Sequence, residues 1–100
     1  MNYAFSSDVA MLVGVDCAIM LEKLNFCIKE NEVNNKNFYD GYYWFCASIK
    51  TFSKLFPFWS EKQIRRILSK LEKDGYIKVG NYNEHLCDRT KWYTLIIKNI

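Results

Sequence analysis

The sequence predicts an α+β domain with three helices and a small antiparallel sheet. Two patterns carry this prediction. Apolar residues recur at three- and four-residue spacing in three segments, as in amphipathic helices, and after Gly75 the pattern changes to the alternation typical of strands. The chain has 100 residues, of which 50% are hydrophobic and 17% aromatic. This is enough apolar material for one folded core and excludes a disordered tail.

The N-terminal part of the chain is predicted to form a short helical turn followed by a long helix. Residues 6–8 (Ser, Ser, Asp) can cap the short turn. Over residues 16–30 the apolar positions follow helical spacing. Asp16 at the start of this helix and Lys29 near its end suit the helix dipole. The polar, Asn-rich stretch 31–37 predicts a loop.

A strand and a second helix are predicted next. The Asp40-Gly41 pair is a turn signal, and the aromatic run 42–45 fits a strand. Ser48 can cap a helix over residues 49–56. Pro57 disfavours helical geometry in the residue before it, so this helix is expected to end there.

The third helix has the clearest local signal in the chain. Ser60 and Gln63 have the spacing of a capping box, in which each side chain bonds the backbone N–H of the other residue. The helix is predicted over residues 61–74, and Gly75 is a typical C-terminal stop. Only residues 57–59 separate it from the preceding helix, which is the spacing of a helix-turn-helix.

The C-terminal part of the chain is predicted to form a hairpin over residues 76–96. Its two strands cover 76–79 and 90–95, and the segment between them is polar and prone to turns. The order is then helix, strand, helix, helix, strand, strand. This is the order of a winged helix-turn-helix, in which the hairpin is the wing and the small first strand pairs with it.

Positive charge gathers in the second half of the chain, which suggests a polyanionic partner. Residues 1–50 carry four Lys or Arg against six Asp or Glu, whereas residues 51–100 carry ten against five. Basic and polar residues off the apolar stripe of the third helix, and others on the hairpin, are candidate contacts to double-stranded DNA. They are Lys62, Arg65, Arg66, Ser69, Lys70, Lys78, Asn83, Arg89 and Lys91.

The sequence gives no support for an enzyme, a metal site or a cofactor. It lacks a glycine-rich phosphate loop and the common metalloprotease and thiol motifs. The single histidine, His85, cannot complete a metal site, and the four cysteines lack zinc-ligand spacing. We expect these cysteines to be buried, unpaired thiols. Trp44, Trp59 and Trp92 can stack on single-stranded bases, but core packing is the favoured interpretation.

The chain is expected to be soluble and cytoplasmic, without a membrane partner. Its longest apolar run, residues 9–15, is far shorter than the roughly 20 residues that a membrane-spanning helix needs. No Lys or Arg precedes Lys23, so the positive start of a secretory signal is missing.

Two sequence blocks resemble a known family. Residues 56–60 (FPFWS), followed by Ile64-Arg65-Arg66 and residues 71–77, form the first, and residues 88–94 (DRTKWYT) form the second. Together they are similar to the N-terminal winged-helix domain of bacteriophage and prophage replication proteins, of the replisome-organiser or replication-initiator type. The resemblance covers residues 9–96. It implies DNA binding in replication initiation, with Lys62, Arg65, Arg66, Arg89 and Lys91 facing the DNA.

A second function class remains open at this point. Winged helices also serve as protein-interaction or dimerisation modules, so fold alone does not settle the partner. In this alternative the chain binds a replisome protein or a second copy of itself. The aromatic residues Tyr3, Phe5, Tyr39 and Tyr82 would then be the contact residues.

Overall fold

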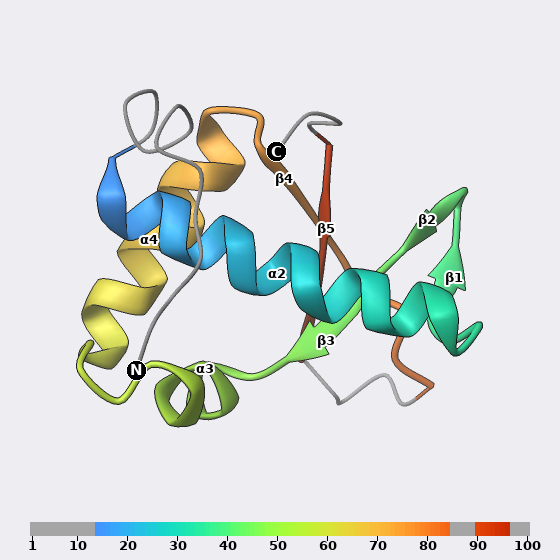
Figure 1. The fold of residues 1–100 in the computed structure, drawn as a ribbon, viewed down its shortest axis with the longest axis horizontal. Helices are drawn as coiled ribbons and strands as arrows, with labels where there is room; N and C mark the ends of the chain where they lie inside the picture. The colour runs from blue at the N-terminus through green and yellow to red at the C-terminus, as the bar shows by residue number, and fades with distance from the viewer. Residues whose placement is uncertain (1–13, 85–89, 97–100) are drawn as a thin grey trace.

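The computed structural model describes residues 14–84 and 90–96, and over these residues three helices and two antiparallel sheets form an α+β domain (Figure 1). In chain order the elements are α2 (Val15–Val33), β1 (Phe38–Tyr39), β2 (Tyr42–Tyr43), β3 (Phe45–Ala47), α3 (Ile49–Leu55), α4 (Glu61–Lys73), β4 (Ile77–Gly80) and β5 (Lys91–Leu95). The helical turn expected near residues 6–12, the tip of the hairpin and Arg89 lie outside the described residues.

Helix α2 is longer than its sequence pattern predicts. It begins at Val15, after Gly14, and ends at Val33, three residues into the predicted loop. A distant contact accounts for the extension, because the side-chain amide of Asn31 donates a hydrogen bond of 2.8 Å to the carbonyl of Trp44. The expectation that Lys29 stabilises the C-terminal end is wrong, since the last turn contains no basic residue.

The predicted aromatic strand is divided in two. The Asp40-Gly41 pair does form a turn, with positive φ at both residues, and it joins β1 to β2 in a small hairpin that the sequence did not predict. Trp44 then separates β2 from β3. Its backbone N–H bonds the carbonyl of Asn37, and its indole N–H donates to the carbonyl of Tyr39 at 2.9 Å. The fully buried Trp44 ring therefore anchors the hairpin instead of continuing the strand.

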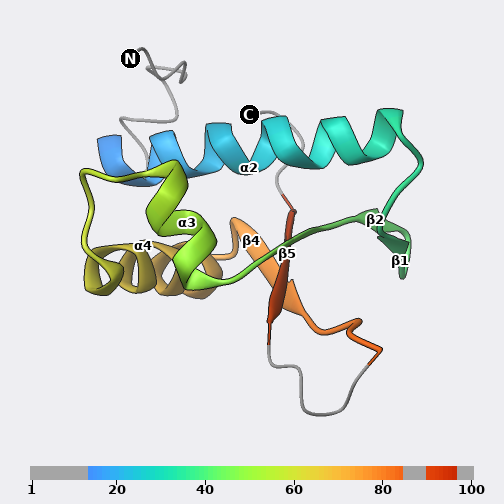
Figure 2. The same cartoon turned by 90° about the horizontal axis from the view of Figure 1, so that it is seen from below.

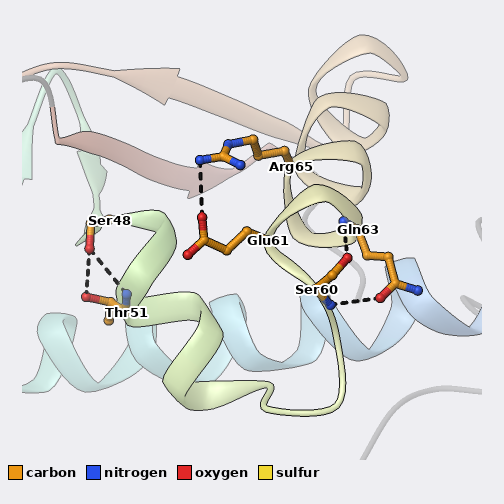
Figure 3. Close-up of polar contacts among 6 residues, drawn as sticks. All are labelled: Ser48, Thr51, Ser60, Glu61, Gln63 and Arg65. Carbon is orange, nitrogen blue, oxygen red and sulfur yellow. Dashed lines mark hydrogen bonds and ion pairs between the residues drawn. The ribbon is translucent and has the colours of Figure 1, made fainter.

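Local signals fix both ends of α3 and α4. The hydroxyl of Ser48 accepts from the backbone N–H of Thr51, and Ser60 and Gln63 form the predicted capping box (Figure 3). Helix α3 ends at Leu55, ahead of Pro57. Helix α4 is followed by Gly75 at φ +82°, a conformation that glycine adopts without strain.

Strand β5 is the centre of the larger sheet. It pairs antiparallel with β3 on one side and with β4 on the other, giving the order β3-β5-β4. The predicted pairing of the first strand with the hairpin is thus present. Helix α2 crosses the sheet and contacts β5, and it also contacts α4, so that one apolar core forms between them (Figure 1).

All three tryptophans are buried, in agreement with the interpretation that they pack in the interior. Trp59 belongs to this core, whereas Trp44 packs against the ring of Tyr82, and Trp92 packs against the rings of Tyr39 and Tyr82. Cys17 is also buried, but Cys27 and Cys46 are only partly so, and Cys87 lies outside the described residues. Along residues 14–84 and 90–96, no helix combines the length and the apolar character needed to cross a membrane.

Candidate nucleic-acid interface

Helix α4 presents one apolar side and one basic side. Ile64, Ile67, Leu68 and Leu71 are buried against the rest of the fold. At about 3.6 residues per turn, the residues directly opposite this stripe project away from the core. They are Lys62, Arg66, Ser69 and Lys73, and all four are exposed. The outward side of α4 therefore carries three cations along its length.

A groove runs beside α4, between this helix, the start of α3 and the β4–β5 hairpin. Its volume is about 500 Å³, and Arg65 and Ser69 of α4 line it together with Thr90 and Lys91 at the start of β5. The groove therefore brings one flank of α4 and the hairpin together. The cationic side chains of Arg65 and Lys91 belong to elements that the sequence alone could not place side by side.

Acidic residues moderate the charge of this groove. Glu72 lines it, and Glu61 lies 3.5 Å from the guanidinium of Arg65, one helical turn away (Figure 3). Both partners of the ion pair are at least half exposed, so the pair is weak and Arg65 remains available to another anion. The sequence carried the signal for this pair, because oppositely charged residues at i and i+4 on a helix are neighbours.

Lys70 lies on the other flank of α4, and Arg66 lies between this flank and the outward side. They line a second hollow, of about 420 Å³, together with residues 14–17 at the start of α2. Arg65 and Arg66 are adjacent in sequence, but Arg65 lines the groove and Arg66 lines the second hollow. The structure therefore does not combine all the predicted α4 contacts in a single site.

The predicted contacts on the hairpin also separate. Val79, Lys91 and Tyr93 line the groove, and because side chains alternate along a strand, Lys78 projects from the opposite face of the sheet. Its ammonium lies 5.5 Å from the centre of the Tyr42 ring, which belongs to the β1–β2 hairpin. Lys78 and Lys91 thus do not share a face.

Asn83 holds the base of the β4–β5 hairpin closed. Its amide nitrogen donates to the carbonyl of Thr90 at 2.7 Å, and its amide oxygen accepts from the indole N–H of Trp92 at 2.8 Å. These two bonds tie the end of the first hairpin arm to the start of the second. A role for Asn83 in contacting DNA stays a prediction, but its side chain is already used within the hairpin.

An aromatic cluster supports the same region from the side of β1. The rings of Tyr39 and Tyr82 stack with their centres 4.6 Å apart, and Trp92 meets both rings edge-on. The Tyr82 hydroxyl donates to the carboxylate of Asp40, and this hydrogen bond raises the pKa of Tyr82 to about 12. No sequence pattern predicts this support, because Asp40 and Tyr82 are 42 positions apart and the Asp40-Gly41 turn signal indicates no distant partner.

Tyr93, on the wall of the groove, has a pKa that its surroundings raise. Burial, with the nearby Glu72 carboxylate as a smaller contribution, raises its pKa to about 12. The neutral form of the Tyr93 hydroxyl is therefore stabilised. Among the residues that the structure describes, no group of three or more His, Cys, Asp or Glu side chains is placed to hold a metal ion.

Comparison with known proteins adds no further constraint on the site. No protein-family model, no curated protein and no solved structure matches this chain.

Proposed function

We propose that this chain binds double-stranded DNA as a winged helix, with α4 as the recognition helix and the β4–β5 hairpin as the wing. The order of the elements and the β3-β5-β4 sheet support this assignment. So does the short connection between α3 and α4, which is typical of a helix-turn-helix.

The observation that carries the proposal is the groove between α4 and the hairpin. Arg65 and Ser69 line one wall, and Lys91 lines the other. A DNA backbone following this groove would meet cations from both elements, while α4 enters the major groove beside it. The hairpin, including Arg89, would then follow the backbone or the neighbouring minor groove.

Different residues take different parts in this arrangement. Lys62, Arg66 and Ser69 project from the outward side of α4, so they are assigned to base edges and to phosphates within the major groove. Arg is suited to bidentate contact with guanine. Lys70 and Lys78 lie away from this side and contribute only to the general positive field.

The biological setting proposed here is DNA replication of a phage or prophage. It rests on the resemblance of residues 56–77 and 88–94 to replisome-organiser domains. The alternative, a module that binds a replisome protein without contacting DNA, uses exposed aromatic residues in place of the cations. Tyr39 remains exposed in the folded chain, although its ring stacks on Tyr82.

The proposal is tested by fluorescence-anisotropy titration of labelled duplexes. One duplex has a random sequence and the others come from the neighbourhood of the gene, each at two salt concentrations. We expect the affinity to fall by roughly one log unit per log unit of salt for each phosphate contacted. Failure to bind any duplex at low salt would overturn the DNA proposal and favour the protein-binding alternative.

Single substitutions separate base contacts from general electrostatic attraction. Arg66→Ala is expected to weaken binding to the preferred duplex by about 1–3 kcal/mol, whereas Lys91→Ala weakens all duplexes by a smaller, similar factor. Lys36→Ala is the matched control, since it removes one exposed cation from the loop between α2 and β1. If Lys36→Ala weakened binding as much as Arg66→Ala, the assignment of α4 would be wrong.

A further inference from the structure

Helix α2 has apolar residues on two opposite sides. One side is buried in the core, with Leu21 and Leu24 at its centre. On the other side Phe26 is 59% exposed and Val33 81%. The other described elements lie to one side of α2, so none of them covers its outer side (Figure 2).

The outer apolar residues follow a regular spacing. Ile19, which is partly buried and also packs against the core, Phe26 and Val33 are seven residues apart, and seven residues are close to two helical turns. They therefore form one stripe, roughly 21 Å long at about 1.5 Å per residue. Isolated exposed apolar side chains are common on protein surfaces, but residues repeated every seven positions stay on one face of a helix and can meet a second helix along that face.

The charges beside this stripe are self-complementary. Glu22 and Lys29 lie along one edge, and Lys23 and Glu30 along the other. None of these four side chains forms an ion pair within residues 14–84 and 90–96. The salt bridge found in this part of the chain joins Arg65 to Glu61. Each edge thus offers one acidic and one basic residue, seven positions apart, without an ion-pair partner in the described part of the chain. The ammonium of Lys23 lies 5.2 Å from the centre of the Phe26 ring, so it borders the stripe directly.

We infer that the outer side of α2 is a dimer interface that pairs with α2 of a second copy, antiparallel, about a two-fold axis at Phe26. With the axis there, Phe26 meets its own counterpart and Ile19 meets Val33 of the other copy. The same register places Glu22 opposite Lys29, and Lys23 opposite Glu30. One choice of axis therefore satisfies both the apolar stripe and both charged edges.

A second copy fits this surface because the surface complements itself. A two-fold interface uses the same patch on both subunits, so each edge must carry both signs of charge in reversed order, as these edges do. The opposed helix dipoles also favour the antiparallel arrangement. A stripe of three apolar side chains is small compared with stable dimer interfaces, so we expect a weak dimer that dissociates on dilution.

Sedimentation velocity over a wide range of protein concentration, without DNA, tests the dimer. We expect a concentration-dependent monomer–dimer equilibrium that Phe26→Glu abolishes. Because Phe26 is largely exposed, this variant should unfold at the same temperature as the unchanged protein, which shows that the fold is intact. A protein that stays monomeric at every concentration, or a Phe26→Glu variant that still dimerises, would overturn the inference.

Charge exchange tests the antiparallel register. Glu22→Lys alone, or Lys29→Glu alone, should weaken dimerisation about fivefold to tenfold, since each puts like charges together at two symmetric places. The double variant restores opposite charges at both places and should return to within about threefold of the original affinity. A double variant as weak as the single ones would refute the antiparallel pairing. Glu32→Lys, which makes the same charge change on α2 away from the stripe, is the matched control and should leave dimerisation unchanged.

Discussion

Asn83 illustrates how far residue type alone can predict a contact. An asparagine beside a hairpin tip, near several cations, fits a DNA-contacting position, and the sequence analysis assigned it so. In the folded chain its amide bonds Thr90 and Trp92, and these bonds span the two arms of the hairpin. Asn83 can thus affect DNA binding indirectly, because its hydrogen bonds hold together the hairpin that carries Lys91.

The single residue Tyr93 predicts how the free energy of unfolding changes at alkaline pH. Its pKa is raised to about 12 in the folded chain, mainly by burial, whereas a tyrosine in an unfolded chain ionises near 10. The unfolded state therefore loses its proton first as the pH rises. The stabilisation that Tyr93 contributes is complete below about pH 10 and disappears between about pH 10 and pH 12.

Urea unfolding at about pH 9 and about pH 11 measures this effect. The unchanged protein should lose about 1 kcal/mol more of its free energy of unfolding between these two values than Tyr93→Phe does. The variant keeps the ring, whose centre lies 5.4 Å from that of Phe52, and lacks only the ionisable hydroxyl group. Equal losses in the two proteins would mean that Tyr93 does not titrate in this way.

Among the elements, α4 is the one whose stability depends most clearly on a local signal. The hydroxyl of Ser60 accepts from the N–H of Gln63, and Gln63 returns a bond to the N–H of Ser60. Ser60→Ala should lower the free energy of unfolding by about 1 kcal/mol, measured by urea denaturation. Ser69→Ala makes the same chemical change at an exposed position within the helix and should have little effect. If both variants were destabilised equally, the capping box would not be the cause.

The elements also differ in how well the sequence predicts them. Both ends of α4 and the start of α3 follow from capping residues and a glycine that act within a few positions. The end of α2 and the β1–β2 hairpin depend instead on Asn31 reaching Trp44 and on Tyr39 stacking against Tyr82. Such contacts join segments that are far apart in the chain, so no local sequence pattern predicts them.

The sequence likewise predicts one part of the candidate interface and not the other. Helical periodicity alone places Lys62, Arg66 and Ser69 on the outward side of α4. It could not show that Arg65 shares a groove with Lys91, nor that Lys78 projects from the opposite face of the sheet, because the register of β4 and β5 decides both. Residue lists drawn from sequence therefore combine positions that the folded chain separates.

For the whole molecule, the two proposed surfaces lie on opposite sides. Helix α2 runs along one side of the fold, while α4 packs beneath it and the β4–β5 hairpin extends away from it (Figure 2). A dimer formed through α2 would therefore direct its two DNA-binding sides apart. Such a dimer could not place both recognition helices on adjacent turns of one straight duplex, as many helix-turn-helix dimers do. It would instead hold two duplexes, or two distant segments of one.

This arrangement predicts DNA bridging that depends on dimerisation. One duplex is fixed to a surface, and capture of a second, fluorescent duplex is measured as protein is added. We expect capture at protein concentrations where the dimer forms, and a loss of at least tenfold for Phe26→Glu. The same variant should still bind a single duplex as a monomer, because Phe26 lies on α2, away from α4 and the hairpin. Retained binding with lost bridging would support both surfaces, whereas full bridging by Phe26→Glu would show that the α2 surface does not join the two copies.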